Sequence, residues 1–293
     1  MALKPYFQLV RLPNLFTAAA DPLAGFLIAG GLFKDVAQWL PLVLAGVCLY
    51  AAGMILNDVF DYEVDLKERP GRPLPSGRAS RWVAAVLGWD LLILGPLLAS
   101  LAGVQSLVVA VVLAGCVLLY DAGRVRPWRR PEVMGACRGL NLLLGMSASA
   151  TLGGPAGWGM AFAFALFVIG VTYISGDEVH FDRSGGVKTG MALQNLAMLA
   201  LICLAAGGHQ TLTGLIGGIL IFFLVGGIVN RADLRAIRAP EPGTIQLAVK
   251  TGVIMLIWLD VALVAVTRGP LLALPVAALW IPAFVLGKWL YST

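Results

Sequence analysis

Long apolar stretches alternate with short polar segments along the whole chain. Most of these stretches run for about 20 residues, the length that a helix needs to cross a ~30 Å hydrocarbon layer. They lack the residue-by-residue alternation that is typical of membrane β-barrels. The pattern predicts an all-α, polytopic membrane bundle with spans at 13–31, 38–58, 81–102, 104–121, 135–153, 157–177, 190–207, 211–230, 247–267 and 270–290. Pro270, Pro275 and Pro282 make the last span irregular or re-entrant, so we expect nine or ten transmembrane helices.

The composition agrees with lipid as the solvent. Hydrophobic residues make up 59% of the chain and charged residues 13%, with a mean hydropathy of +0.86, whereas soluble domains carry about 25% charged residues. The first apolar stretch has Arg11, Asn14 and Asp21 in or before it, so we expect a membrane helix there rather than a signal peptide. The four cysteines are scattered and show no spacing of a zinc site or disulfide framework.

The basic residues gather on one side of the predicted bundle. When the spans are assigned to alternate sides, 19 of the 21 lysines and arginines fall on the side of the N-terminus, and only Lys34 and Arg268 fall on the other. The positive-inside rule makes the first side cytoplasmic. We therefore expect an integral protein of the bacterial inner-membrane type, with its N-terminus and its active-site loops in the cytoplasm. The net charge of +5 reflects this topology, so no nucleic-acid partner is expected.

Two acidic clusters follow apolar spans on the cytoplasmic side. If the second span continues as a helix, Asn57, Asp61 and Asp65 share one face, and Asp58 adjoins it. Stacked carboxylates repel one another, so a resident cation is expected, and oxygen-only ligands favour Mg²⁺. Metal ions held by two such clusters can bridge the oxygens of a diphosphate. The second cluster contains Glu178 and Asp182 at i and i+4, with His180 between them.

Arginines lie close to these acids in the sequence. The segment 67–78 is broken by prolines and glycines and contains Arg72, whose forked donors suit phosphate oxygens. A further polar patch begins at Tyr120, continues to Arg124 and reaches Arg138, which shares a helix face with Asn141. Ionisable residues within a span normally face the bundle interior, which favours contact with a bound anion. The alternative for each arginine is a topological charge or a side chain that snorkels to the interface.

These motifs resemble the UbiA superfamily of intramembrane prenyltransferases. Asn57-Asp58-x-x-Asp61-x-x-x-Asp65 matches that family's first aspartate motif at each fixed position, and Glu178-x-x-x-Asp182 stands where the second motif belongs. Tyr120-x-x-x-Arg124 is similar to the family's Tyr-x-x-x-Lys element. The stretches 137–141 and 178–180 look most like an EboC-like branch. The resemblance implies one domain over residues 1–293, with nine helices around a central cavity that opens to the cytoplasmic side.

The resemblance also implies a reaction. The protein would be a Mg²⁺-dependent transferase that moves a prenyl group from an allylic prenyl diphosphate to an aromatic or other lipid-accessible acceptor of unknown identity. The donor's apolar tail would lie in the bundle or in membrane lipid. Asp61, Asp182 and His180 would be catalytic, with His180 as the base. The metal ligands implied are Asn57, Asp58, Asp61, Asp65, Glu178 and Asp182, and the diphosphate contacts implied are Arg72, Arg124, Arg138 and Tyr120.

Two other functions remain open from the sequence. A UbiA-type terpene synthase would cyclise the prenyl diphosphate without an acceptor. A transporter or lipid-binding membrane protein is a different class, but it would distribute its charges along a path across the bilayer. Because the charges here concentrate at one mouth of the bundle, the pattern favours an enzyme.

Overall fold

A computed structural model describes residues 4–121, 130–177 and 185–290. Within these ranges all regular elements are helices, which confirms the all-α prediction. They are α1 (Lys4–Leu9), α2 (Leu12–Ile28), α3 (Val36–Phe60), α4 (Tyr62–Glu68), α5 (Arg81–Ser100), α6 (Val104–Asp121), α7 (Arg130–Met146), α8 (Gly154–Gly176), α9 (Gly185–Gly207), α10 (Leu212–Arg238), α11 (Pro242–Arg268), α12 (Pro270–Ala278) and α13 (Trp280–Leu290).

Each of the ten predicted spans corresponds to helix in the described ranges. Among the described residues, eight segments are long and apolar enough to cross a membrane: α3, α5, α6, α8, α9, α10, α11 and the α12–α13 pair over Pro270–Trp289. Helix α2 is apolar but shorter, with 17 residues. Helix α7 also has 17 residues and carries Arg138 in its interior. The chain is therefore an integral membrane protein.

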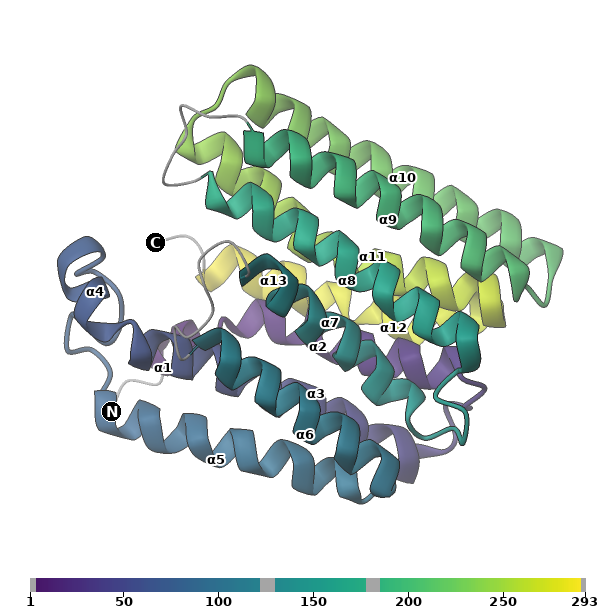
Figure 1. Cartoon of the computed structure of the whole chain (residues 1–293), viewed down its shortest axis with the longest axis horizontal. Helices are drawn as coiled ribbons and strands as arrows, with labels where there is room; N and C mark the ends of the chain where they lie inside the picture. Colours follow the sequence, from purple (N-terminus) through teal and green to yellow (C-terminus); the bar gives the residue numbers. More distant parts are fainter. Residues whose placement is uncertain (1–3, 122–129, 178–184, 291–293) are drawn as a thin grey trace.

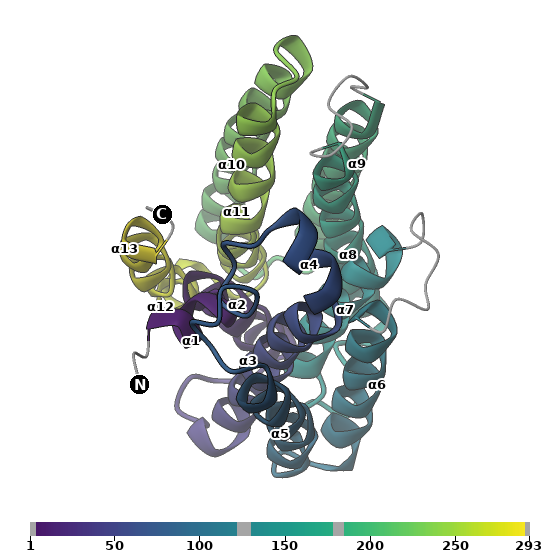
Figure 2. The ribbon, with the colours of Figure 1, turned by 90° about the vertical axis from the view of Figure 1, so that its left-hand side faces the viewer.

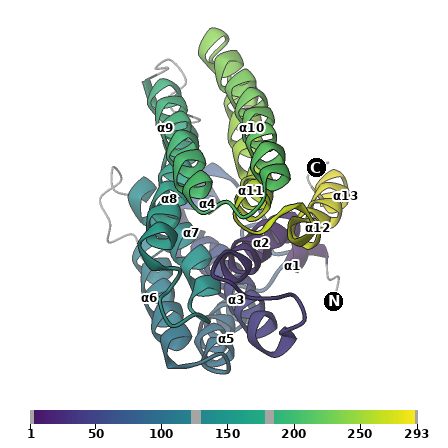
Figure 3. The same cartoon turned by 90° about the vertical axis from the view of Figure 1, so that its right-hand side faces the viewer.

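The long helices run broadly along one axis of the molecule (Figure 1). Helix α2 lies inside the bundle, in contact with α3, α7, α11 and α13. Seen from one end, α8 and α9 form one arm and α10 and α11 another, while α4 lies at that end near the bundle axis (Figure 2). The opposite end shows the same two arms (Figure 3). One large apolar core joins these parts, with fully buried side chains such as Leu27, Leu142 and Phe164.

Helices α2 and α7 approach each other closely through small residues. A Cβ atom added to Gly145 would overlap the backbone carbonyl of Pro22, and one added to Gly25 would overlap that of Leu142. Small residues allow this approach because membrane helices associate by packing and hydrogen bonding, without a hydrophobic difference between lipid and protein. The close contact places polar side chains of α7 against the α2 backbone.

Some element boundaries differ from the prediction for physical reasons. The segment 231–246, which separates the predicted spans 211–230 and 247–267, is mostly helical, because α10 continues to Arg238 and α11 begins at Pro242. A second small core that includes Ile174, Ala236 and Ile245 stabilises these extensions. The span expected at 135–153 is shifted, since α7 ends at Met146. The last span is irregular as expected, because the helix is interrupted at Leu279, between α12 and α13.

Lys34 and Arg268, the two basic residues predicted on the side opposite the N-terminus, lie in the same region of the bundle. Arg268, at the end of α11, donates from Nη2 to the Gly30 carbonyl at 3.3 Å. Gly30 and Lys34 belong to the connection between α2 and α3, at the end of the bundle opposite α4 (Figure 1). The acidic motif and its arginines thus lie at one end of the bundle and these two basic residues at the other.

Candidate active site

The first acidic motif spans the junction of α3 and α4. Helix α3 ends at Phe60, and Asp61 forms the turn into α4 with φ −83° and ψ 4°. Helical hydrogen bonding nevertheless continues, because Asp61 N donates to the Asn57 carbonyl and Asp65 N to the Asp61 carbonyl, both at 2.9 Å. The predicted i, i+4, i+8 spacing of Asn57, Asp61 and Asp65 is kept, although two helices stand where one was expected.

Arg72 joins the two ends of this motif. Its Nη1 atom lies 2.6 Å from Asp65 Oδ2 and 3.2 Å from Asp58 Oδ1. Asp58 and Asp65 are 8% and 3% exposed, whereas the Arg72 side chain is 23% exposed. Hydrogen bonds between charged groups are shorter and stronger than those between neutral groups. The arginine favoured from the sequence therefore does lie at the acidic motif.

The loop between α4 and α5 fixes the position of Arg72. Arg78 donates to the Gly71 carbonyl at 2.6 Å and to Ser76 Oγ at 3.0 Å, while Ser76 Oγ donates to the Arg72 carbonyl at 2.6 Å. Leu74 is 3% exposed and packs into a small core with Leu9 and Ile55. This apolar anchor and these hydrogen bonds hold the loop against α1 and α3.

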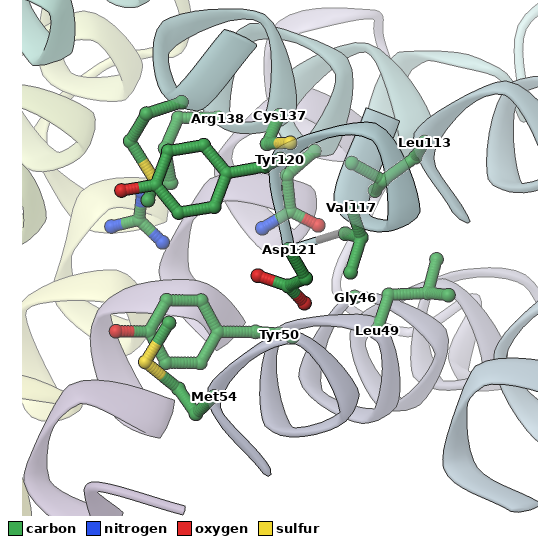
Figure 4. Close-up of a pocket in the computed structure, with 13 residues that line it drawn as sticks. Gly46, Leu49, Tyr50, Met54, Leu113, Val117, Tyr120, Asp121, Cys137 and Arg138 are labelled. Carbon is green, nitrogen blue, oxygen red and sulfur yellow. The ribbon is translucent and has the colours of Figure 1, made fainter. Parts of the chain in front are cut away.

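A pocket opens between α3, α6 and α7, beside the motif. Figure 4 shows that Tyr50 of α3, Tyr120 and Asp121 of α6 and Arg138 of α7 all point into it. The remaining lining residues are mostly apolar: Gly46, Leu49, Gly53, Met54, Leu113, Val117, Met134, Cys137 and Asn141. The pocket thus combines an apolar wall with a few polar groups, which is typical of small-molecule sites.

Sequence reasoning missed Asp121. Its side chain is buried, with the residue 5% exposed, and Oδ2 has no hydrogen-bond partner. The Asn57 side chain is near this carboxylate, and Asp58 and Asp61 are close enough to repel it. The sequence feature that could have indicated Asp121 is its position as a single acid at the end of an apolar span, next to Tyr120.

Arg11 was also missed as a neighbour of the acids. It precedes α2 with φ 47° and ψ 55°, a left-handed conformation that is costly for a residue with a side chain. From there its charge interacts with Asp58. The sequence did not predict Arg11 as a neighbour of the acids, because no local pattern shows that the α1–α2 turn faces the end of α3.

Arg138 and Asn141 share a face as predicted, and that face meets α2. Arg138 Nη1 lies 3.1 Å from Asp21 Oδ2, and Nη2 donates to Thr17 Oγ1 at 3.0 Å. Asn141 donates to Asp21 Oδ2 at 2.9 Å and to the Ala18 carbonyl at 2.8 Å. Arg138 lines the pocket, but its ion pair and its hydrogen bond are with residues of α2. Its role as a diphosphate ligand therefore stays a prediction.

Four predicted site residues lie outside the described residues: Arg124, Glu178, His180 and Asp182. The flanking helices are described. Asp177 follows α8, and its Oδ2 accepts a hydrogen bond from Val187 N in the first turn of α9 at 3.0 Å. This contact ties the end of α8 to the start of α9. The second acidic motif remains a prediction.

The described residues offer oxygen ligands but not a complete metal site. Among residues 4–121, 130–177 and 185–290, no three His, Cys, Asp or Glu side chains converge on one point. Mg²⁺ usually keeps several waters and takes one or two carboxylates together with substrate phosphates. The Asn57 amide, the neighbouring carboxylates and the unpartnered Asp121 Oδ2 fit that kind of site, in which a substrate completes the coordination.

Fold and site together define a polytopic helical membrane protein with an acidic, arginine-flanked site at one end of the bundle. The sequence profile of the UbiA prenyltransferase family matches residues 20–241. The chain belongs to this family and is a membrane prenyltransferase.

Individual relatives agree with this assignment. The digeranylgeranylglyceryl phosphate synthase of Sulfurisphaera tokodaii is 31% identical over 200 residues, which cover 64% of this chain and 69% of that protein. A solved structure of a digeranylgeranylglyceryl phosphate synthase has a TM-score of 0.62 at 22% identity, covering 90% of this chain and 98% of the other. A UbiA homologue from Archaeoglobus fulgidus, bound to GPP and Mg²⁺, has a TM-score of 0.57 at 15% identity, covering 84% and 99%. At these identities the two structures show the fold.

Proposed function

We propose that this prenyltransferase uses an allylic prenyl diphosphate as donor and binds its diphosphate, with Mg²⁺, at the α3–α4 junction. The observation that carries the proposal is the Arg72 bridge between Asp58 and Asp65, beside the mouth of an apolar pocket. The Archaeoglobus fulgidus homologue, bound to GPP and Mg²⁺, supports the same ligand chemistry.

The site residues follow from the motifs and the geometry. Mg²⁺, when bound, supplies positive charge that neutralises the leaving diphosphate. The ligands proposed are those of the two acidic motifs: Asn57, Asp58, Asp61, Asp65, Glu178 and Asp182. Arg72 presents further N–H donors beyond its bonds to the two carboxylates and is positioned to bind diphosphate oxygens. Arg124, Arg138 and Tyr120 are the other proposed diphosphate contacts.

The pocket accommodates the prenyl part of the donor. Leu49, Leu113 and Val117 form an apolar wall below the polar groups at its mouth. An apolar wall keeps water from the reacting carbon, which protects a cationic transition state from hydrolysis. The rings of Tyr50 and Tyr120 point into the same space and are available for cation–π attraction (Figure 4).

The acceptor is proposed to be a lipid-accessible molecule, and a glyceryl phosphate lipid is the first to test. The reason is the product in the names of relatives, digeranylgeranylglyceryl phosphate. The acceptor must lose a proton as its bond to the prenyl carbon forms, and His180 is the proposed base. The EboC-like branch also stays a proposal, because the relatives named above carry another name.

One domain with a cytoplasmic site is proposed for the whole chain. The large apolar core contains residues of α2, of α3 and of each helix from α5 to α13, which supports one domain over 1–293. The basic residues around α4 support a cytoplasmic position for that end of the bundle. Single cysteines at Lys67 and Lys34, in a background without native cysteines, test the orientation. An impermeant maleimide is expected to label K34C from outside and K67C only in inverted vesicles; the reverse pattern contradicts the orientation.

The activity test uses purified protein in detergent with Mg²⁺ and radiolabelled geranylgeranyl diphosphate, with and without the glyceryl phosphate lipid. We expect acceptor-dependent transfer in the wild type and its loss in Asp61→Asn and Asp182→Asn. Glu68→Gln is the matched control, because Glu68 is an exposed acid at the end of α4, outside the membrane-spanning helices. A cyclic or alcohol product without acceptor would indicate the terpene synthase instead. Full diphosphate release in both acid variants would refute the proposed site.

A further inference from the structure

The last turns of α10 carry a stripe of residues that the proposed site does not use. Six positions at i, i+3, i+4, i+7, i+8 and i+11 line an open groove of about 440 Å³: Gly227, Asn230, Arg231, Leu234, Arg235 and Arg238. This spacing puts them on one face of the helix. Phe222, Val229 and Ala236 are buried on the opposite face. The groove therefore lies on the outside of the bundle, at the same end as α4 (Figure 1).

The three arginines of the stripe are available to bind an anion. Arg231, Arg235 and Arg238 are exposed, and none of them forms an ion pair in the part of the chain that the structure describes. A guanidinium presents a planar fork of donors that fits two phosphate oxygens. The stripe thus offers several such forks within three turns of helix.

The length of α10 brings these arginines to the membrane boundary. The helix has 27 residues, so it is about 40 Å long and exceeds the ~30 Å hydrocarbon layer. Its apolar part begins at Leu212, and the arginines stand at the opposite end. The arginines therefore reach the layer of lipid head groups.

The same helix face is apolar where it precedes the arginines. Phe223 and Leu224 are 70% and 66% exposed, and Leu220 continues this surface one turn earlier. Exposed apolar side chains on a membrane helix contact lipid tails, which are as apolar as leucine. A Cβ atom built on Gly227 meets no atom within 4 Å, so open space joins the apolar part to the arginines.

Helix α9 is fixed beside the groove by a pair of amides. Asn195 donates to Asn230 Oδ1 at 2.7 Å, and Asn230 donates to Asn195 Oδ1 at 2.9 Å. These reciprocal bonds engage the carbonyl and the NH₂ group of both side chains. Asn230 therefore holds α10 against α9, and recognition of a ligand falls to the arginines.

We propose that this stripe binds an anionic phospholipid, with the phosphate on Arg231, Arg235 and Arg238 and an acyl chain along Phe223 and Leu224. Basic pockets at membrane helices recognise the head groups of anionic lipids. A phospholipid matches both halves of the stripe, whereas a soluble phosphate would match the arginines alone. None of these residues belongs to the proposed diphosphate site, so the inference does not depend on the proposed reaction.

Native mass spectrometry of the purified protein in detergent tests this site. The protein is titrated with anionic phosphatidylglycerol and with zwitterionic phosphatidylcholine, and the lipid-bound fraction gives each Kd. We expect the wild type to bind phosphatidylglycerol at least ~10-fold more tightly than phosphatidylcholine. Arg231→Gln/Arg235→Gln should weaken phosphatidylglycerol binding at least ~10-fold, because it removes two charges next to the phosphate.

A second double variant separates a specific site from general attraction between charges. Lys67→Gln/Arg69→Gln removes two exposed basic residues at the same end of the bundle. We expect it to stay within about threefold of the wild type, because attraction over more than a Debye length is screened. Equal losses in the two double variants, or unchanged binding in Arg231→Gln/Arg235→Gln, would overturn the proposal.

Gly227→Leu tests the groove without a change of charge. Leucine is the better helix former and enters open space at this position, so the fold is kept. We expect phosphatidylglycerol binding to weaken at least ~3-fold, since the added side chain clashes with the lipid. Gly217→Leu is the control, because Gly217 also faces open space but lies about 15 Å earlier along α10. Unchanged binding in Gly227→Leu would contradict a shaped lipid site.

Competition with inorganic phosphate distinguishes a lipid from a soluble anion. At constant ionic strength, millimolar phosphate is expected to leave phosphatidylglycerol bound, because phosphate makes no contact with Phe223 or Leu224. Displacement of the lipid by phosphate would show that the arginines bind a soluble anion, and the lipid site would be refuted.

Discussion

The guanidinium of Arg72 meets the carboxylate of Asp65 at 2.6 Å, and the same nitrogen reaches Asp58 at 3.2 Å. The acids are held together by a cation that also faces the site. Arg72 thus offsets the repulsion within the motif. In the proposed function it would also supply donors to the diphosphate.

Removing Arg72 should impair use of the donor. We expect Arg72→Ala to lower kcat/KM for the prenyl diphosphate at least ~100-fold, the usual effect of losing one preorganised donor to a developing anion. Arg72→Lys should recover only part of the rate, because an ammonium lacks the planar fork. Arg81→Ala is the control: its ion pair with Glu63 is exposed, at 47% and 73% of the side chains. A threefold or smaller effect of Arg72→Ala would contradict the assignment.

A larger side chain in the pocket should change the preferred donor length. Leu113 is 3% exposed and lines the pocket, so Leu113→Phe fills space proposed for the prenyl chain. We expect the ratio of kcat/KM for geranyl over geranylgeranyl diphosphate to rise by about 10-fold or more, since pocket contacts discriminate by 10- to 200-fold per group. The neighbouring Val112→Phe, at a 49% exposed position, should leave the ratio unchanged. Equal ratios in the wild type, Leu113→Phe and Val112→Phe would indicate that the prenyl chain binds outside this pocket.

The Arg138–Asp21 pair should be sensitive to the loss of one partner. Arg138→Met leaves Asp21 buried, at 0% exposure, without its cation. Breaking such a pair typically costs about 3–5 kcal/mol of folding free energy. The double variant Asp21→Asn/Arg138→Met should recover most of that loss, because no charge of the pair stays unpaired. Thermal unfolding in detergent measures the stability of the single and the double variant. A double variant that is less stable than Arg138→Met would contradict an energetic coupling between Asp21 and Arg138.

The α2–α7 contact should depend on Gly145. A methyl group there meets the Pro22 backbone, so Gly145→Ala is expected to destabilise the bundle by about 1–3 kcal/mol, the usual cost of overpacking. Gly115 on α6 has no atom within 4 Å of an added Cβ. Gly115→Ala should therefore be neutral or slightly stabilising. The unfolding midpoints of the two variants give the comparison, and a neutral Gly145→Ala would argue against the close packing.

Local patterns predicted the bundle and the first acidic motif well. Apolar runs near the bilayer thickness identified each membrane segment, since burial in lipid acts on each segment separately. Helical periodicity correctly placed Asn57, Asp61 and Asp65 in one register across the α3–α4 junction. The lengths of α10 and α11 were less predictable, because apolarity ends at the membrane boundary while the hydrogen-bonded helix continues.

The sequence by itself thus determined the membrane fold class, the one-sided charge distribution and the spacing of acids within one helix. Only the tertiary structure decided that Asp121 lies beside Asn57 and that Arg138 binds Asp21. These pairs come from different helices, and no local periodicity encodes which faces meet. Their contacts depend on packing, such as the Gly145 approach to α2, where close fit between whole helices selects the neighbours.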